Sequence, residues 1–267
     1  MQALRLTEIW IYPIKSLGGI RLKQANVFEK GLQFDRRWML VDETGKFLTQ
    51  RVHPTMALLK VSIVGDALII THAQTQQSHS IPLQVQQVQQ SQPVTIWDDT
   101  VLAYEVNLES SQWFTEQLGI NCKLVYFPEE NDRAVDPRYA TTEHVSLADG
   151  YPFLIIGQAS LDDLNSRLEK KVPMNRFRPN FVFNGGTAFE EDHWKEFSIG
   201  TNRFVGVKPC SRCVLITVDQ DTAQKSEEPL RTLSIYRKRD NKIYFGQNLL
   251  AIDHSVVREG DLITLYA

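Results

Sequence analysis

Lys208-Pro209-Cys210-Ser211-Arg212-Cys213 runs directly into residues 214–218, which are mostly apolar and β-branched. Two of the three cysteines in the chain stand in this stretch, three positions apart, with two cations beside them. A thiolate binds metals and attacks electrophiles, and neighbouring positive charge favours the thiolate over the thiol. The stretch therefore indicates a reactive or metal-bound sulfur, and the β-branched run after it predicts a strand.

Several chemistries fit two cysteines at this spacing. A structural zinc site usually takes four ligands in two pairs, but Cys122 stands alone and the histidines form no close pair. A thioredoxin-like dithiol normally opens a helix, whereas a strand is predicted here. Two buried, inert cysteines are a third alternative, which the adjacent cations disfavour. The fourth is a single thiolate ligand to a cofactor, with polar neighbours binding the anionic part of that cofactor.

The composition is that of an ordinary folded protein. The chain has 267 residues, 42% of them hydrophobic and 23% charged. A net charge of −3 lacks the basic surplus that is typical of nucleic-acid-binding proteins. No apolar run approaches the ~20 residues of a membrane span, and the N-terminal residues lack the layout of a signal peptide. Few cysteines, at an odd count, fit a reducing compartment. We therefore predict a cytoplasmic protein with no nucleic-acid partner and no membrane span.

Short strand-like runs alternate with turns through most of the chain. The Gln-rich segment 74–92 is predicted to be an edge strand, and residues 217–222 a turn. Two helices are predicted, one ended by Gly119 and one begun by a capping-box pattern of Ser160 and Asp163. Many strands and few helices favour a mainly β fold of barrels with decorating helices. The predicted strands are 6–12, 37–41, 46–50, 57–64, 67–71, 181–183, 203–207, 214–218 and 262–265, and the predicted helices are 111–118 and 160–168.

The large aromatic side chains are predicted to be structural. All five tryptophans lie in or beside strand or helix runs, which favours packing in cores or at a domain interface. They are Trp10, Trp38, Trp97, Trp113 and Trp194. The long charged loop at residues 128–142 is typical of a functional lid or a mobile connection.

Further segments carry a resemblance to a known family. They are Ile11-Tyr12-Pro13-Ile14-Lys15-Ser16, Gly31-Leu32, Asp35-Arg36-Arg37-Trp38-Met39-Leu40-Val41, Leu147-Ala148-Asp149-Gly150-Tyr151-Pro152-Phe153-Leu154, Ala159-Ser160-Leu161-Asp162-Asp163-Leu164-Asn165, Phe177-Arg178-Pro179-Asn180 and Phe245-Gly246-Gln247-Asn248. With the Cys-Ser-Arg-Cys motif in its place, their order resembles the MOSC family. Within that family it resembles the amidoxime-reducing group, which binds the molybdenum cofactor. The resemblance covers nearly the whole chain.

The resemblance implies a fold and a metal ligand. It implies an N-terminal β-barrel domain, which we place at residues 1–118, and a MOSC β-barrel domain at residues 119–267. It also implies a molybdenum atom bound by two sulfurs of a pyranopterin and by the second cysteine of the motif, Cys213. Cys210 is then a neighbour. Some relatives carry a C-terminal iron–sulfur domain, but no cysteine follows Cys213 here. Electrons would therefore come from a separate donor protein of the ferredoxin, flavodoxin or reductase type.

The cofactor carries a phosphate and a polar pterin ring, which need cations and N–H donors. From the residues alone, Lys15 and Arg36 also fit solvated strand ends, and Arg178 a structural ion pair. Asn180 fits either a pterin contact or a loop tie. Asp149 fits either an acid that delivers protons or a turn cap. The resemblance implies that the cofactor is bound by Lys15, Ser16, Arg36, Arg178, Ser211 and Arg212. We also predict contacts to it from Asn180, from Asn248 and from Gly150, which allows close backbone approach.

The implied reaction is the two-electron reduction of N-hydroxylated compounds, namely hydroxylamines, amidoximes and N-hydroxylated purines, to amines or amidines. The predicted catalytic residues are Cys213, which the resemblance implies, and Asp149, the candidate acid. The alternatives are a carrier that holds sulfur or immature cofactor on a cysteine persulfide, and a structural barrel without cofactor. Pyridoxal phosphate binding and detoxification are expectations at the level of the family only.

Overall fold

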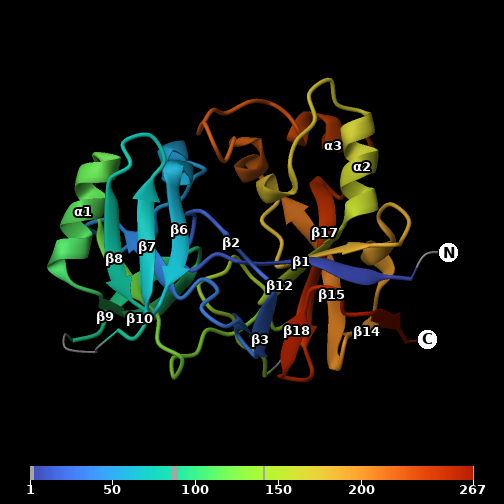
Figure 1. Cartoon of the computed structure of the whole chain (residues 1–267), viewed down its shortest axis with the longest axis horizontal. Helices are drawn as coiled ribbons and strands as arrows, with labels where there is room; N and C mark the ends of the chain where they lie inside the picture. The colour runs from blue at the N-terminus through green and yellow to red at the C-terminus, as the bar shows by residue number, and fades with distance from the viewer. Residues whose placement is uncertain (1–2, 86–89, 141, 267) are drawn as a thin grey trace.

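The computed structural model describes residues 3–85, 90–140 and 142–266, and its fold is mainly β, as predicted. Figure 1 shows two lobes side by side, with α1 and β6–β10 in one lobe and the largest sheet, α2 and α3 in the other. The order in the largest sheet is β19-β14-β15-β17-β12-β13-β1-β2, with β16 paired to β17. In that order, its strands are Ile263–Leu265, Glu196–Ile199, Asn202–Arg212, Lys242–Ala251, Phe153–Gly157, Phe181–Asn184, Arg5–Ile11 and Ile20–Leu22, and β16 is Lys238–Arg239.

Three smaller sheets complete the fold. Their orders are β5-β11-β10-β9, β18-β3-β4 and β6-β7-β8. In these orders the strands are Trp38–Val41, Lys123–Tyr126, Asp99–Glu105 and Gln92–Ile96; Val256–Arg258, Gln24–Phe28 and Gly31–Leu32; and Leu59–Val64, Ala67–His72 and Ser78–Pro82. The Gln-rich segment holds the edge strand β8, as predicted, while its residues 86–89 lie outside the described residues.

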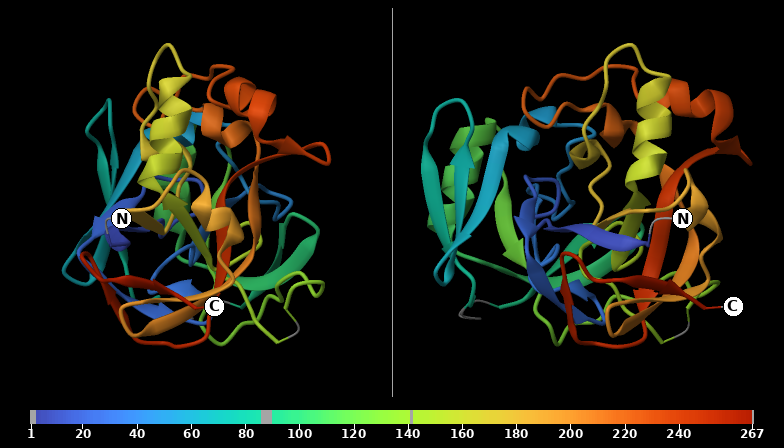
Figure 2. Two further views of the ribbon diagram at one scale, coloured as in Figure 1. Left: turned by 90° about the vertical axis from the view of Figure 1, so that its right-hand side faces the viewer. Right: turned by 45° about the vertical axis from the view of Figure 1, so that its right-hand side comes forward.

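The helices are short and pack against the sheets, α1 against β11, α2 against β12 and β13, and α3 against β17. α2 and α3 lie close together at one end of their lobe in both views of Figure 2, and both contribute leucines to one core cluster with Phe245 of β17. Within the described ranges, no helix combines the length and the apolar character needed to cross a membrane. The α-helices α1–α3 are Leu108–Leu118, Gln158–Ser166 and Leu230–Tyr236, and the 3-10 helices η1–η4 are Pro54–Leu58, Met174–Arg176, Glu190–His193 and Val214–Thr217.

The first strand belongs to the sheet of the second half of the chain. β1 pairs antiparallel with β13, where Leu6 lies opposite Phe183 and Ile9 opposite Phe181. The side chains of Leu6 and Ile9 are fully buried in one core cluster with those two phenylalanines. β3 likewise pairs with β18 near the C-terminus. The predicted division at residues 118 and 119 stays a prediction, because the sheets combine strands from both sides of it.

The predicted strand at residues 214–218 is wrong, because residues 214–217 form η4. β15 stays paired with β17 up to Arg212, and Cys213, still extended, directly precedes η4. The Thr217 hydroxyl donates to the carbonyl of Val214 at 2.8 Å, and Leu215 and Ile216 are buried. Packing of these side chains overrides the strand preference of a β-branched run. The predicted strand at 46–50 is also reduced, to isolated bridges at Lys46 and Phe47.

The two predicted helices exist, but only one has the predicted cap. Gly119 ends α1 in the left-handed region, at φ 65°, as predicted. α2 begins at Gln158, so Ser160 is its third residue and not its N-cap. The N-cap position is held by Gly157, which has no side chain to cap the helix. Glu191 accepts from the Gly157 N–H at 3.1 Å and from the Ser160 hydroxyl at 2.9 Å instead. A buried carboxylate from a distant segment therefore replaces the predicted capping box.

Candidate functional site

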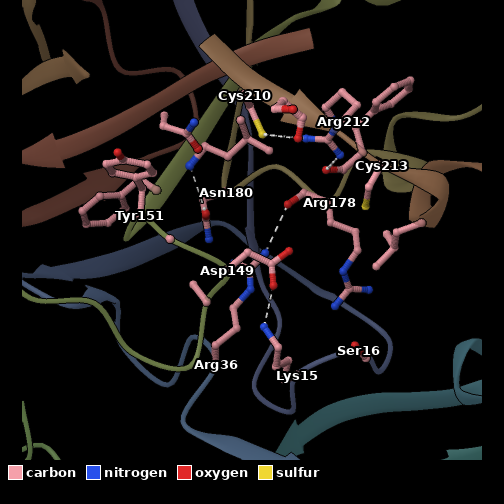
Figure 3. A pocket seen from close by; sticks show the side chains of 18 of the residues that line it. Lys15, Ser16, Arg36, Asp149, Tyr151, Arg178, Asn180, Cys210, Arg212 and Cys213 are labelled. Atoms are coloured by element: carbon pink, nitrogen blue, oxygen red, sulfur yellow. Dashed lines mark hydrogen bonds and ion pairs between the residues drawn. The ribbon is translucent and has the colours of Figure 1, made fainter. Parts of the chain in front are cut away.

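All eleven residues predicted for the site line one cavity of about 380 Å³ (Figure 3). Loops that follow or precede strands carry most of them: Lys15 and Ser16 follow β1, Arg36 precedes β5, Asp149 and Gly150 precede β12, and Arg178 and Asn180 precede β13. β15 contributes Ser211 and Arg212 at its end, with Cys213 next, and β17 contributes Asn248. Segments from both halves of the chain thus meet at one place, although their individual roles stay predictions.

The backbone is strained around this cavity. Ser16, Arg36, Trp97 and Arg178 have φ of 66°, 52°, 56° and 55°, in the left-handed region that side chains with a Cβ rarely adopt. Such a conformation costs about 1–3 kcal/mol and persists only where the surrounding structure enforces it. A gathering of strained residues at one cavity is typical of a functional site.

Two arginines stack on one tyrosine beside the cavity. The guanidinium of Arg36 lies 4.2 Å from the centre of the Tyr12 ring, and that of Arg178 lies 4.1 Å from it. Arg178 is buried and donates from Nη1 to the carbonyl of Leu17 at 2.7 Å. Burial lowers the pKa of Arg178 to about 10, with the neighbouring Arg36 also acting downward. An anion in the cavity would relieve this excess of positive charge.

Asp35 lies fully buried behind these arginines and fixes Arg36. Its Oδ2 accepts from Arg36 Nη1 at 2.5 Å and from Asn180 Nδ2 at 3.2 Å, and its Oδ1 accepts from the Tyr12 N–H at 2.7 Å. Asn180 also donates to the carbonyl of Trp10 and accepts from the Leu154 N–H. The Asn180 amide is thus used within the protein, which favours the loop-tie interpretation over the predicted pterin contact.

Asp149 accepts from donors on three separate loops. Lys15 Nζ and Arg51 Nη2 each donate to it at 2.6 Å, and Trp97 Nε1 donates at 3.3 Å. Desolvation opposes ionisation, but the charges of Lys15 and Arg51 outweigh it and hold the pKa of Asp149 well below its ordinary value. Asp149 is therefore a carboxylate here, and its predicted role as a proton-delivering acid stays a prediction.

Sequence reasoning missed Arg51 and misjudged Trp97. Arg51 donates from Nε to Cys213 Sγ at 3.1 Å, and its guanidinium lies 4.7 Å from the Trp97 ring. Trp97 is 43% exposed and lines the cavity, so its predicted core packing is wrong. Trp38 and Trp194 are buried as predicted. No spacing or motif marks Arg51 among the charged residues of the chain, because its partners come from distant segments.

The two thiols of the motif contact different arginines. Cys213 Sγ accepts from Arg51, whereas Cys210 Sγ accepts from Arg212 Nη1 at 3.2 Å. Arg212 also donates from Nη2 to the carbonyl of Phe177, while its buried Nε has no partner among the described residues. Across those residues no three His, Cys, Asp or Glu side chains lie close enough to hold a metal ion. The four-ligand zinc interpretation therefore lacks its ligand set in that part of the chain.

The cavity fits the molybdenum cofactor that the sequence implies. Its lining includes the cations Lys15, Arg36, Arg51, Arg178 and Arg212 against the single carboxylate of Asp149. The unpartnered Arg212 Nε is a buried donor of the kind that an anionic or carbonyl oxygen satisfies. Cys213 supplies a thiol at the same surface. Excess positive charge, an unused buried donor and a sulfur ligand together match an anionic metal–pterin group.

Lys15 provides a prediction on pH. Burial lowers its pKa to about 8, against the opposite effect of Asp149, whereas the unfolded chain keeps the ordinary value of 10.5. Above about pH 8 the unfolded state therefore binds more protons than the folded state, so the free energy of unfolding rises with pH. We expect Lys15 to contribute a rise on the order of 2 kcal/mol between about pH 8 and 10. Urea unfolding at several pH values measures it.

Lys15→Met is the control for this prediction, since the variant keeps the aliphatic length without the titrating group. Its unfolding free energy should lack the rise that the wild type shows from pH 8 to 10. Readings above pH 10 are to be avoided, because burial raises the pKa of Tyr12 to about 12 and produces the opposite slope there. Equal slopes in wild type and variant would contradict the lowered pKa of Lys15.

Fold and cavity together define a mainly β protein with a cation-lined pocket beside a Cys-Ser-Arg-Cys motif. Residues 3–121 match the MOSC N-terminal beta barrel domain, and residues 142–264 match the MOSC domain. The chain belongs to the MOSC family, which confirms the resemblance seen in its sequence.

Similar proteins include two amidoxime-reducing components. Mitochondrial amidoxime-reducing component 1 of Mus musculus is 32% identical, over 97% of this chain and 82% of the relative. Mitochondrial amidoxime reducing component 2 of Bos taurus is 35% identical, over 96% and 80%. The molybdenum cofactor sulfurase of Oryza sativa subsp. japonica is 29% identical over 98% of this chain, which spans 34% of that protein. These names mention neither pyridoxal phosphate nor detoxification, and two of them are mitochondrial, so the predicted cytoplasmic location stays a prediction.

Proposed function

We propose that this chain is a molybdenum-cofactor-dependent oxidoreductase that reduces N-hydroxylated compounds with electrons from a separate donor protein. The observation that carries the proposal is the cavity itself, where the thiol of Cys213 and the adjacent Arg212 meet four cations from distant loops. Similarity to amidoxime-reducing components along almost the whole chain supports the same reading.

The residues of the cavity would bind the cofactor in two ways. Arg36, Arg178 and Arg212 would bind the anionic and carbonyl oxygens of the cofactor, because arginine offers a rigid fork of N–H donors. Cys213 would be the protein ligand of the metal. When bound, the cofactor supplies a redox centre that takes up and gives off two electrons.

Protons are the other requirement of the reaction. Reduction of R–NHOH to R–NH2 consumes two electrons and two protons, breaks the N–O bond and releases water. Lys15 Nζ lies 2.6 Å from Asp149 Oδ1, and its pKa of about 8 makes it a readier proton donor than an ordinary lysine. We assign the pair the task of holding a proton at Lys15 Nζ and passing it through Asp149 Oδ1 towards the cavity.

The test uses protein made in a cell competent for cofactor synthesis. We expect about one molybdenum and one pterin per chain, and reduction of benzamidoxime in an anaerobic assay with reduced viologen dye. NADH alone should not support turnover, because the sequence has no Gly-x-Gly-x-x-Gly motif in a strand–turn–helix setting. Turnover with NADH alone would refute the need for a separate donor.

A carrier of sulfur or of immature cofactor is the second candidate. The similarity to a molybdenum cofactor sulfurase favours it, and so does the half-buried thiol of Cys213 beside Arg51. A carrier should show a persulfide on Cys213 or Cys210 by mass spectrometry, with no dependence on metal. If protein shown to contain molybdenum gives no turnover with dye, the carrier becomes the better reading.

Arg178→Ala should weaken cofactor retention without unfolding the chain. The variant removes a charge-assisted donor, and such hydrogen bonds are worth roughly 1.5–3 kcal/mol, or about one to two decades of affinity. Pterin fluorescence after dialysis measures retention. Arg178→Lys, which keeps a charge but loses the fork, should fall between the wild type and the alanine variant. Unchanged pterin content in Arg178→Ala would contradict the assigned role.

A further inference from the structure

Arg51 lies in the cavity as a ligand would. One face of its planar guanidinium stacks on the Trp97 ring at 4.7 Å, and its Nη2 donates to Asp149 Oδ2 at 2.6 Å. Its Nε points to Cys213 Sγ at 3.1 Å, next to the predicted reacting centre. One flat N–C–N group is thus bound by an aromatic face and a carboxylate while it touches the sulfur.

The backbone of Trp97 is held in a strained conformation beside the cavity. It stands in the turn between β9 and β10, at φ 56°, where Gly, Asn or Asp is the usual choice. A bulky residue in that conformation is an outlier, and such strain gathers at functional sites. Phe47 supports the ring at a centroid distance of 5.0 Å, and Trp97 Nε1 reaches Asp149 Oδ1. The strain is explained if the aromatic face serves a ligand.

We propose that Trp97 and Asp149 form a subsite for a planar N–C–N group of the substrate or product, and that Arg51 fills this subsite while no ligand is bound. An amidoxime and the amidine formed from it share the flat N–C–N plane and the N–H donors of a guanidinium. The Trp97 face would take the plane, and the Asp149 carboxylate would accept its N–H groups. Arg51 is then a built-in competitor that gives way to the ligand.

The inference rests on the proposed function, because it names the substrate group that the same cavity recognises. Its test needs neither molybdenum nor turnover, so its failure is distinct from failure of that function. The probe is benzamidine, whose binding to the full chain without cofactor is measured by isothermal titration calorimetry.

Arg51→Ala should bind benzamidine about tenfold more tightly than the wild type, because the competing guanidinium is gone. Arg51→Gln, which lacks the guanidinium cation, should also bind benzamidine more tightly than the wild type. It keeps the prediction testable if the alanine variant does not fold. Adding Trp97→Leu to Arg51→Ala should remove about tenfold of affinity, since the stacking face is lost. Weaker or equal binding in both Arg51 variants would overturn the competitor role.

Two controls separate shape from charge. Arg239→Ala removes a guanidinium that stacks on Tyr244 at 5.0 Å away from the cavity, so it should leave benzamidine affinity unchanged. Benzylamine carries the same ring and charge without an N–C–N plane, so Arg51→Ala should improve its affinity less than that of benzamidine. If Arg51→Ala increased the affinity for both compounds equally, the site would recognise charge alone, and the proposed subsite would be overturned.

Discussion

Cys213→Ser should purify with molybdenum reduced to background, whereas Cys210→Ser should keep most of it. A serine hydroxyl is a far poorer ligand than a thiolate for a metal that is held through sulfur. Cys210 is bonded to Arg212 and Cys213 to Arg51, so the two thiols lie in different settings within one cavity. Metal analysis of both variants, made in the same cofactor-competent cells, measures the difference.

The two variants also separate the assignment of Cys213 as the metal ligand from the membership of the chain in the MOSC family. If Cys210→Ser loses the metal and Cys213→Ser keeps it, the ligand assignment is reversed while membership of the family is unaffected. If both variants keep molybdenum, the metal is held without a cysteine of this motif. Pterin content, measured separately, shows whether the whole cofactor or the metal alone has left.

Asp35→Ala should be among the most destabilising single changes in the chain. Asp35 is fully buried and its partner Arg36 is 13% exposed, so truncation leaves a largely desolvated guanidinium without its carboxylate. The Tyr12 N–H also loses its acceptor, and the Asn180 amide loses one of its two. Removing one member of a buried ion pair costs about 3–5 kcal/mol. Urea unfolding measures the loss, and pterin retention should fall with it because Asp35 holds Arg36 at the cavity.

Asp163→Ala is the matched control. Asp163 of α2 pairs with Arg167, the residue that follows the helix, in a partly exposed setting, and pairs at this i,i+4 spacing contribute about 0.3–0.5 kcal/mol. The variant should unfold close to the wild type and keep its cofactor. If Asp35→Ala unfolds no more easily than Asp163→Ala, the buried network behind the cavity does not stabilise the protein.

The sequence was sufficient for elements whose signals are local. Alternating burial in β7, and glycine at position 119, follow from side-chain periodicity and backbone preference. The gathering of the motif residues in one cavity agrees with the resemblance, which brought together segments that no spacing connects.

The parts that sequence reasoning missed depend on distant partners. The sequence around Ser160 predicts a capping box, but the distant Glu191 supplies the hydrogen bonds at that helix start. Residues 214–217 have the pattern of a strand, but burial of Leu215 and Ile216 accompanies a 3-10 helix there. Arg51 and Trp97 belong to the cavity only because Asp149 and Cys213 meet them there. None of these contacts leaves a pattern in neighbouring residues.

The pairing of β1 with β13 affects how this protein folds during its synthesis on the ribosome. β1 is among the first segments to emerge, but the strand that covers it, with Phe181 and Phe183, is made in the second half of synthesis. At ~5–20 residues per second, the apolar side chains of β1 wait on the order of ten seconds or more for that partner. During this interval β1 presents a strand edge of the kind that chaperones shield and that aggregates recruit. Slower translation upstream of residue 181 should therefore lower the soluble yield of the protein.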